Sequence, residues 1–401
     1  MNPTTVVSEP VSGAPETVEV AGKSPVTPVG QGRLVSLDAF RGITIAGMLL
    51  VNNPGTWAHI YNPLEHAKWN GWTPTDLIFP FFIFIVGVAM TFSFGKLMER
   101  GADRHALMLK TAKRALLIFL VGLALHSFPW LGYDYAHLRI PGVLQRIAIA
   151  YLFAAMIYLY TSTRGQVVAI AALLLGYWAL QTLVPVPGGY AGVLAPGQDL
   201  GAYIDRAIFT ANHVWREART WDPEGLLSTL PAIGTALLGG LAGTWIRGKR
   251  GQLEIVSGLF IAGAVLMALG GMWGWVFPIN KSLWTSSYVL FTAGFACQFL
   301  ALCYWLIDVK GYQRWARPFV IYGMNAIAAF FLSGAFARVL NLVKWTGDDG
   351  KPIVLKTFIY KTFYESWLQP INASLLFAIT YVLFFLGIMT IMYRRRIFIK
   401  L

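Results

Sequence analysis

Apolar residues along this 401-residue chain fall into blocks of about twenty, separated by short segments rich in Gly, Pro and charge. A block of that length crosses the hydrocarbon core of a bilayer as an α-helix, whereas a membrane β-barrel would alternate polar and apolar positions. The pattern predicts an all-α, polytopic transmembrane helical bundle with about ten spanning helices. We expect spans at residues 36–53, 74–95, 112–128, 143–161, 166–184, 226–246, 254–273, 285–307, 318–340 and 373–393.

The composition agrees with this pattern, and the distribution of charge adds an orientation. Hydrophobic residues make up 56% of the chain and charged residues 13%, which is too little polar surface for a soluble globule. If the loops alternate across ten spans, 19 Lys and Arg residues lie on the side of the N-terminus and 10 lie on the other side. Basic loops face the cytoplasm, so we expect both termini there, a lipid bilayer as partner and no binding of nucleic acid.

Residues 1–33 contain no continuous apolar core and therefore no cleavable signal peptide. We expect a disordered cytoplasmic tail over residues 1–33 and one transmembrane domain over residues 34–401. The loops on the far side of the membrane are long and rich in Trp, Tyr, Asn, Asp and Glu, which is where functional groups usually lie. They cover residues 54–73, 129–142, 185–225 and 341–372.

Several polar residues lie inside or at the ends of the expected spans, where a charge needs a partner or a function. Asp38 and Arg41 share one helix face, and they either form an ion pair or bind a ligand. Arg146, preceded by Gln145, lies about one turn inside its span and either pairs with a carboxylate or binds a phosphate or acyl oxygen. The segment 73–76, Thr-Pro-Thr-Asp, has the pattern of a capping box, so we expect Asp76 to stabilise the start of a helix.

The segment between the first two spans combines Asn, His, Trp and Gly at the outer surface, and His59 and His66 lie within it. A single histidine at the interface is more often a hydrogen-bonded aromatic than a catalyst, and its polar neighbours raise the case for acid–base chemistry only moderately. No His or Cys pair has the spacing of metal ligands, and the chain has no Gly-rich phosphate loop, so we expect no metal site.

Several motifs, taken in order, resemble the heparan-alpha-glucosaminide N-acetyltransferase family of transmembrane acyltransferases, including its bacterial members found with N-acetylglucosamine utilisation. The motifs are Ser-Leu-Asp-Ala-Phe-Arg-Gly at 36–42, Val-Asn at 51–52, His-Ala-Lys-Trp-Asn-Gly at 66–71, Asp-Leu-Ile-Phe-Pro at 76–80, residues 139–146, Asp-Pro-Glu-Gly-Leu-Leu at 222–227, Asn-Lys-Ser-Leu-Trp at 280–284 and Gly-Met-Asn at 323–325. The resemblance runs from about residue 33 to the C-terminus. It does not include the lumenal domain and following helix of the lysosomal member, so the expected compartment is the bacterial inner membrane.

The resemblance implies an enzyme that moves an acetyl group from cytoplasmic acetyl-CoA to the amine of a glucosamine on the far side of the membrane. The active-site histidine of the family falls on His66 and its polar neighbour on Asn52. His66 is then either the base that accepts the amine proton or a transient acetyl carrier, and Asn52 either donates to the thioester oxygen or orients the imidazole.

Two further groups of residues are expected to surround the substrates. We expect Glu65, Asp76 and Trp69 to bind the amino sugar, and Asp38, Arg41, Gln145, Arg146 and Asn325 to bind acetyl-CoA or line its channel. The acceptor, a free amino sugar or a glycan, stays open, and a homodimer is expected only by analogy with the family. The main alternative function is a secondary transporter of an amino sugar, in which the buried charges would relay substrate or protons.

Overall fold

A computed structural model describes residues 34–347 and 350–399, so the tail expected at residues 1–33 lies outside the described range. The all-α prediction is confirmed, with one two-stranded hairpin added. The helices are α1 Val35–Asn52, α2 Ile78–Glu99, α3 Arg104–His126, α4 Val143–Tyr160, α5 Thr163–Leu183, α6 Leu200–Phe209, α7 Thr229–Arg247, α8 Gln252–Trp273, α9 Ser286–Tyr304, α10 Arg317–Met324, α11 Ala326–Leu342, α12 Leu355–Tyr360 and α13 Pro370–Arg394. Strands β1 Lys344–Thr346 and β2 Pro352–Val354 pair antiparallel, with Trp345 opposite Ile353.

Five short helical segments join these elements. They are the 3₁₀ turns η1 Asn62–Leu64, η2 Pro74–Leu77 and η3 Tyr135–His137, and the π-helical turns η4 Trp305–Val309 and η5 Lys361–Glu365. The turn η2 leads directly into α2, and η4 continues α9. Both turns therefore lengthen a helix at its end.

Eight helices in the described ranges are long and apolar enough to cross a membrane, or nine if α10 and α11 form one bent span. They establish a multi-pass helical membrane protein and account for eight of the ten expected spans, or nine with the bent pair. The tenth, at residues 112–128, falls in α3, whose first half carries Arg104, Lys110, Lys113 and Arg114 and leaves an apolar stretch only over residues 115–125. These cations explain why α3 is less apolar than the other long helices.

The span expected at 318–340 is not one straight helix, because the chain bends by 83° between α10 and α11. Asn325 lies at the bend and is 1% exposed. Its side-chain amide donates to the carbonyl oxygen of Ile397 and accepts from the amide of Ile399, both at 3.0 Å. The Asn325 side chain thus hydrogen-bonds to the backbone of the C-terminal segment at the point where the helix is interrupted. Short polar side chains often compete with helical hydrogen bonds in this way.

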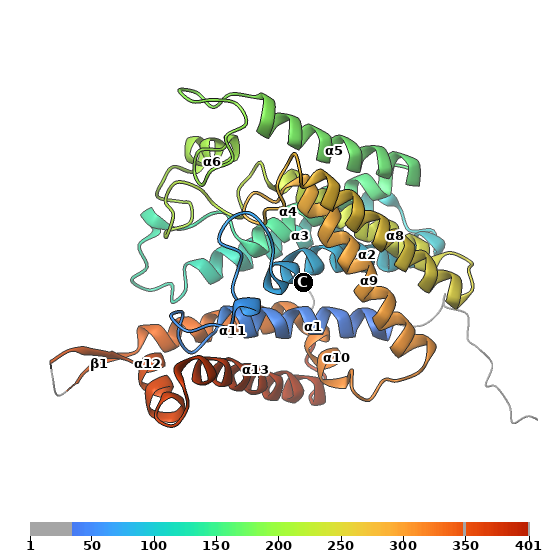
Figure 1. Cartoon of the computed structure of the whole chain (residues 1–401). Coiled ribbons are helices and arrows are strands. Elements are labelled where there is room, and N and C mark those ends of the chain that lie inside the picture. The colour runs from blue at the N-terminus through green and yellow to red at the C-terminus, as the bar shows by residue number, and fades with distance from the viewer. Residues whose placement is uncertain (1–33, 348–349, 400–401) are drawn as a thin grey trace, which may run out of the picture. The chain divides into compact units, whose positions relative to one another are not determined.

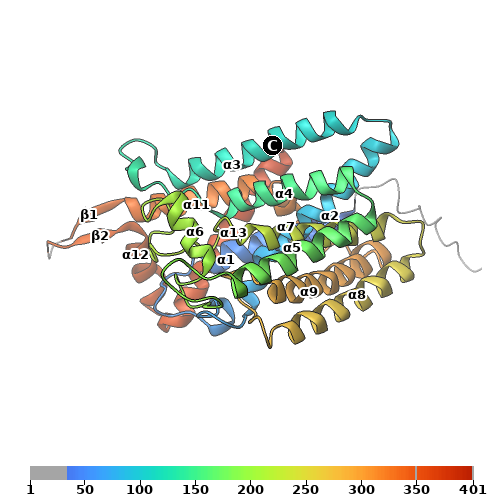
Figure 2. The same ribbon diagram turned by 90° about the horizontal axis from the view of Figure 1, so that it is seen from above.

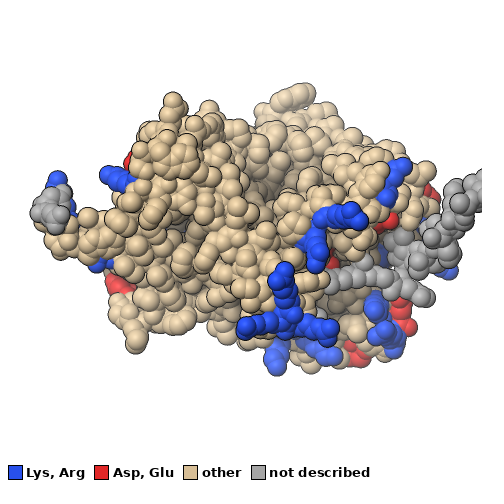
Figure 3. Space-filling view, turned by 90° about the horizontal axis from the view of Figure 1, so that it is seen from below, with Lys and Arg blue, Asp and Glu red and all other residues tan. Residues whose placement is uncertain are grey.

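The long connections gather at one end of the helices. Figures 1 and 2 show α6, α12 and the β1–β2 hairpin at the same end, on the left of both views. On the face in Figure 3 the Lys and Arg side chains concentrate towards the opposite end. Helix α13 ends at Arg394, and Arg394, Arg395 and Arg396 are exposed. On this face the basic side chains are therefore more numerous at the end opposite the long polar connections.

Helices α1 and α10 pack backbone against backbone. A Cβ atom added at Gly42 would overlap the carbonyl oxygen of Phe319, and one added at Gly323 would overlap the carbonyl oxygen of Asp38. Small residues permit this close approach, which is the usual basis of helix association in a membrane. The packing places the first turn of α1 against α10.

We predict that Gly42→Ala destabilises the protein by about 1–3 kcal/mol, because the added methyl group must push α10 away from α1. The apparent melting temperature of detergent-solubilised protein measures the effect. Gly387→Ala in α13 is the matched control, since nothing lies within 4 Å of a Cβ at that position. Equal melting temperatures for both variants would contradict the close packing of α1 and α10.

Candidate functional site

His66 lies on an irregular segment between α1 and α2, and its ring is oriented by Asp76. The Nδ1 atom of His66 lies 2.7 Å from Oδ1 of Asp76. The His66 side chain is 46% exposed, whereas the Asp76 side chain is 1% exposed. An imidazole held through Nδ1 by a buried carboxylate leaves Nε2 as the nitrogen for proton transfer, which is the arrangement of a histidine acting as acid or base.

Asp76 also organises the backbone around His66. Its Oδ2 atom accepts from the amides of Ala67 and Thr73, both at 3.0 Å, and from the Thr73 hydroxyl at 3.2 Å. The bond from the Thr73 amide confirms the predicted capping box, here at the start of η2. The carbonyl oxygen of Asp76 accepts from the hydroxyl of Tyr288 on α9 at 2.5 Å. Both carboxylate oxygens are therefore occupied, which favours orientation of His66 over binding of an ammonium ligand.

Lys281 completes this group, although it is 215 residues from His66 in sequence. Its Nζ atom lies 3.0 Å from both ring nitrogens of His66 and 3.7 Å from Oδ1 of Asp76. The Lys281 side chain is 21% exposed. Burial lowers the pKa of Lys281, while Asp76 and Glu224 act in the opposite direction. We refer to His66, Asp76 and Lys281 as the histidine cluster.

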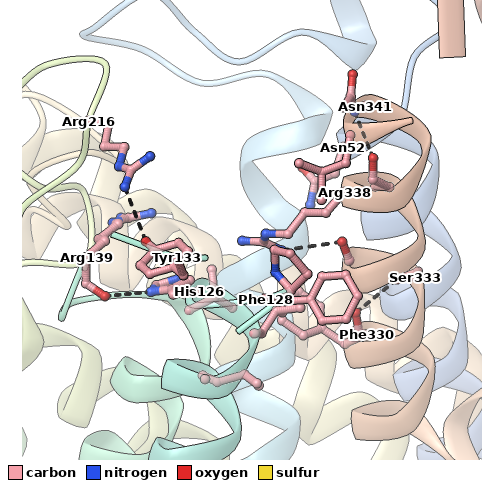
Figure 4. A pocket seen from close by; sticks show the side chains of 18 of the residues that line it. Asn52, His126, Phe128, Tyr133, Arg139, Arg216, Phe330, Ser333, Arg338 and Asn341 are labelled. Atoms are coloured by element: carbon pink, nitrogen blue, oxygen red, sulfur yellow. Dashed lines mark hydrogen bonds between the residues drawn. The ribbon is translucent and has the colours of Figure 1, made fainter. Parts of the chain in front are cut away.

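A cavity of about 900 Å³ is lined by residues of α1, α3, α4 and α11 and of the long connections 128–139 and 215–216. Asn52 lines it, together with His126, Arg139, Gln145 and Arg338. Aromatic residues also line it: Phe128, Tyr133, Trp215 and Phe330. Figure 4 shows Arg338 extending from α11 with Asn52 and Asn341 beside it, and His126 and Arg139 on the other side. A mostly preformed pocket with aromatic walls and a few polar groups suits a small polar ligand.

Two arginines of the cavity wall differ in how they are neutralised. Arg139 contacts Asp222 through Nε at 2.9 Å and Nη2 at 2.6 Å, and its Nη2 lies 2.5 Å from Glu224. Burial alone would lower the pKa of Arg139, but these two carboxylates outweigh burial and raise it. Arg338 donates to the carbonyl oxygen of Gly334 at 3.3 Å, and no carboxylate of the described residues pairs with it. Arg338 therefore contributes an unneutralised positive charge to the wall.

A row of tryptophans joins the cavity to the segment that carries His66. Trp215, on the cavity wall, contacts Trp221 at a ring-centroid distance of 5.1 Å, and Trp221 contacts Trp69 at the same distance. Trp69 also donates to the carbonyl oxygen of Leu194 at 2.9 Å. The indole ring predicted to bind substrate is thus packed into this row, and it connects two parts of the site.

The residues expected to bind acetyl-CoA or line its channel lie in two groups. Asp38 and Arg41 form an ion pair of 3.3 Å, and Arg41 donates to Gly323 of α10, two residues before Asn325. Gln145 lines the cavity. Arg146 is 1% exposed, donates to the carbonyl oxygen of Gly225 at 3.2 Å and lies over the Trp284 ring at 4.9 Å. Its Nε and Nη1 atoms have no hydrogen-bond partner among the described residues.

The structure therefore joins some of the predicted site residues and separates others. His66, Asp76 and, through the tryptophan row, Trp69 belong to one region, and Glu65 is exposed beside His66. Asn52 lines the cavity, whereas His66 is not part of the cavity wall. The residues 34–347 and 350–399 contain no cluster of three His, Cys, Asp or Glu side chains suited to a metal ion.

Three further candidates did not emerge from the sequence: Lys281, Arg338 and His126. Lys281 stands in one of the motifs that carry the family resemblance, but nothing in the sequence pairs it with His66. Arg338 had a usable signal, because a charge inside the span expected at 318–340 is itself a functional hypothesis. His126 had none, since its bonds to Arg139 and Gln145 depend on the fold.

Asp205 on α6 is a buried acid next to this region. Its Oδ1 atom accepts from the amide of Leu226 at 2.8 Å. Burial, reinforced by Asp222 and Asp199, raises the pKa of Asp205 to about 7. Because the folded pKa lies above the unfolded value, the folded state binds the proton more tightly, and stability is lost as the pH rises from about 4 to about 7.

We predict that Asp205→Asn removes this loss, because the amide oxygen retains the bond to Leu226 and cannot ionise. The variant should be nearly as stable as the wild type at about pH 4 and more stable at pH 8, by up to about 4 kcal/mol. Melting curves at both pH values test this, with the exposed Glu217→Gln as control. A melting-temperature difference independent of pH would refute it.

Comparison with known proteins agrees with the motifs. A family model described as heparan-alpha-glucosaminide N-acetyltransferase, catalytic, matches residues 33–257. A mouse protein named heparan-alpha-glucosaminide N-acetyltransferase is 31% identical over 352 residues, which cover 74% of this chain and 53% of that protein. The human protein of the same name is 32% identical over 353 residues, covering 74% and 52%. The chain thus spans about half the length of the curated relatives that it matches.

Proposed function

The chain belongs to the heparan-alpha-glucosaminide N-acetyltransferase family, and from this premise we propose that it transfers an acetyl group from acetyl-CoA to the amine of a glucosamine-type sugar. The observation that carries the proposal is the pair of His66 and the buried Asp76, whose 2.7 Å contact orients an exposed imidazole. Attack of an amine on a thioester requires a base that works near neutral pH, and histidine is the usual one.

In the proposed reaction Nδ1–H of His66 donates to Asp76, and Nε2 accepts the proton that the sugar amine loses as it attacks the thioester carbon. The carbon–sulfur bond then breaks, and the proton passes to the leaving sulfur of CoA. Buried Asp76 serves this step by fixing the tautomer and orientation of the ring. The alternative, in which Nε2 itself carries the acetyl group, uses the same orientation and differs in the order of events.

The cavity is the proposed substrate site. Its aromatic residues Phe128, Tyr133 and Trp215 offer the flat apolar surfaces that suit a sugar ring, and Asn52 and Asn341 offer amides for its hydroxyl groups. Asn52 thus serves as a donor to the substrate, in place of a direct contact with the imidazole. Glu65, exposed next to His66, is the available carboxylate for the ammonium form of the acceptor.

The polarity of the molecule supplies the proposed direction of transfer. The basic end, seen in Figure 3, is proposed to face the cytoplasm of a bacterial inner membrane, with both termini on that side. The cavity then opens on the far side, where the acceptor sugar binds. Acetyl-CoA is proposed to approach from the cytoplasm, with Arg41 near its phosphates.

One observation favours a second candidate, a secondary transporter of an amino sugar. The interrupted pair α10–α11, bent by 83° at Asn325, is a feature that transporters also use near their substrate sites. Proteoliposomes distinguish the two functions. Label moving from acetyl-CoA to the amine supports the enzyme, and sugar uptake without any acyl donor supports the transporter.

We predict that His66→Ala lowers the rate of acetyl transfer to glucosamine by about 10²–10⁴-fold, the usual contribution of a general base. Activity of purified protein in nanodiscs with labelled acetyl-CoA is the measurement. His59→Ala, an exposed histidine on the same segment, is the matched control and should retain full activity. Turnover of His66→Ala at the wild-type rate, with folding intact, would eliminate His66 as the base.

The two roles of His66 make different predictions for exchange of label between acetyl-CoA and free CoA. If His66 is only a base, no exchange occurs without an acceptor, because the thioester is attacked only by the amine. If His66 carries the acetyl group, exchange proceeds without acceptor and disappears in His66→Ala. We expect no exchange, and acceptor-independent exchange in the wild type would replace the base mechanism with the acetyl-carrier mechanism.

A further inference from the structure

Lys281 reaches the histidine cluster from a turn that is built onto the His66 segment. The amide of Gly71 donates to the carbonyl oxygen of Ile279 at 2.8 Å, and the side chain of Asn280 donates to Asn70 at 3.1 Å. The Asn280 side chain also accepts from the amide of Leu283 at 2.9 Å, which closes the turn. These bonds fix the backbone on either side of Lys281, so its approach to His66 is part of the fold.

Burying an ammonium group in this way is costly unless it has a partner and a function. The partner is the carboxylate of Asp76, 3.7 Å away, whose own exposure is 1%. With Lys281 present, one negative and one positive charge balance in the histidine cluster and the imidazole can stay neutral. Without Lys281, His66 would be the nearest cation for a buried carboxylate, and a protonated Nε2 would be unable to accept a proton.

The other charged groups near the histidine cluster leave this balance intact. Glu224 and Arg146 act on Lys281 with opposite signs. Glu65 and Lys68, on the His66 segment, are both exposed and carry opposite charges. From α9, Tyr288 contributes a neutral hydroxyl that donates to the backbone of Asp76. Asp76 and Lys281 are therefore the two charges that His66 meets at close range.

Resting on the proposed function, we propose that Lys281 is a catalytic residue that lies against the His66 imidazole in the resting enzyme, 3.0 Å from both ring nitrogens, and moves to the thioester oxygen when acetyl-CoA binds. The flexible side chain makes this movement possible, because Nζ carries three N–H donors at the end of a four-carbon stem with rotatable bonds. The movement leaves Nε2 free to act as the base, and it brings a positive charge to the oxygen where negative charge develops.

The step balances as follows. The amine nitrogen forms a bond to the thioester carbon, the carbonyl electron pair moves to oxygen, and the amine proton goes to Nε2 of His66. Lys281 donates a hydrogen bond to this oxyanion and keeps its own proton. When the oxyanion collapses, the carbon–sulfur bond breaks, sulfur leaves with the electron pair, and the His66 proton moves to sulfur to give the CoA thiol.

The test compares Lys281→Met with Lys68→Met, a matched loss of one charge at an exposed position of the His66 segment. We expect Lys281→Met to lower kcat by about 10²–10³-fold, the loss typical of one oxyanion donor, with KM for glucosamine nearly unchanged. The acid limb of its kcat/KM–pH profile should move upward by about one pH unit, since the balancing cation is gone. A lysine that only stabilised the fold would lower the melting temperature without moving the pH profile.

Chemical modification keeps the test informative if Lys281→Met folds poorly. In Lys281→Cys, attachment of an aminoethyl group through a disulfide should restore activity, whereas an uncharged ethyl group should not. The wild type, treated separately with each reagent, is the control for modification of Cys297 and Cys303, which are buried. Equal rescue by both groups would overturn the proposal in favour of packing.

The outcomes separate this inference from the proposed function. If the wild type transfers no acetyl group to any amine, the proposed function fails. If the wild type is active and His66→Ala is inactive, but Lys281→Met retains the wild-type rate and pH profile, only the role of Lys281 fails.

Discussion

The carboxylate of Asp76 holds together parts of the chain that are far apart in sequence. It orients His66 ten residues before it, closes the capping turn at Thr73 and lies 3.7 Å from Lys281. Its backbone carbonyl is bonded to Tyr288 on α9. Because the side chain is 1% exposed, each of these bonds replaces one to water. The position of the His66 imidazole therefore depends on Asp76, the same carboxylate that forms the capping box at the start of η2.

Buried charge recurs around Asp76, and the fold compensates it to different degrees. Leaving one member of a buried pair without its partner costs several kcal/mol, so loss of one partner would destabilise the fold. Arg139 is met by Asp222 and Glu224, and Arg146 by a carbonyl oxygen and the face of Trp284. The Trp284 ring contacts Tyr288 at 5.3 Å, which links this charged region back to Asp76. The site is consequently one connected network from the cavity wall to the histidine cluster.

The sequence predicted those features that form between residues close together in the chain. The apolar blocks located the long helices, the Thr-Pro-Thr-Asp pattern located the capping box, and the i, i+3 spacing anticipated the Asp38–Arg41 pair. The contact of Lys281 with His66 and the cavity between α1, α3 and α11 arise from the packing of distant segments. Such packing produces no periodic pattern in the sequence from which it could be predicted. The bend at Asn325 escaped prediction for the same reason, because the C-terminal segment that bonds to it lies 72 residues further on.

Helices α1 and α11 connect the two ends of the proposed reaction. Arg41 and Asn52 are eleven residues apart on α1, which corresponds to roughly 16 Å of helix. On α11 the cavity side carries Phe330, Ser333, Ala337 and Asn341, a spacing of three to four residues that defines one helix face. The same helix begins at the Asn325 bend, beside the α10 segment that receives the bond from Arg41. In the proposed reaction, a donor held by its phosphates at the basic end extends along α1 and α11 to bring its thioester to the end that carries His66.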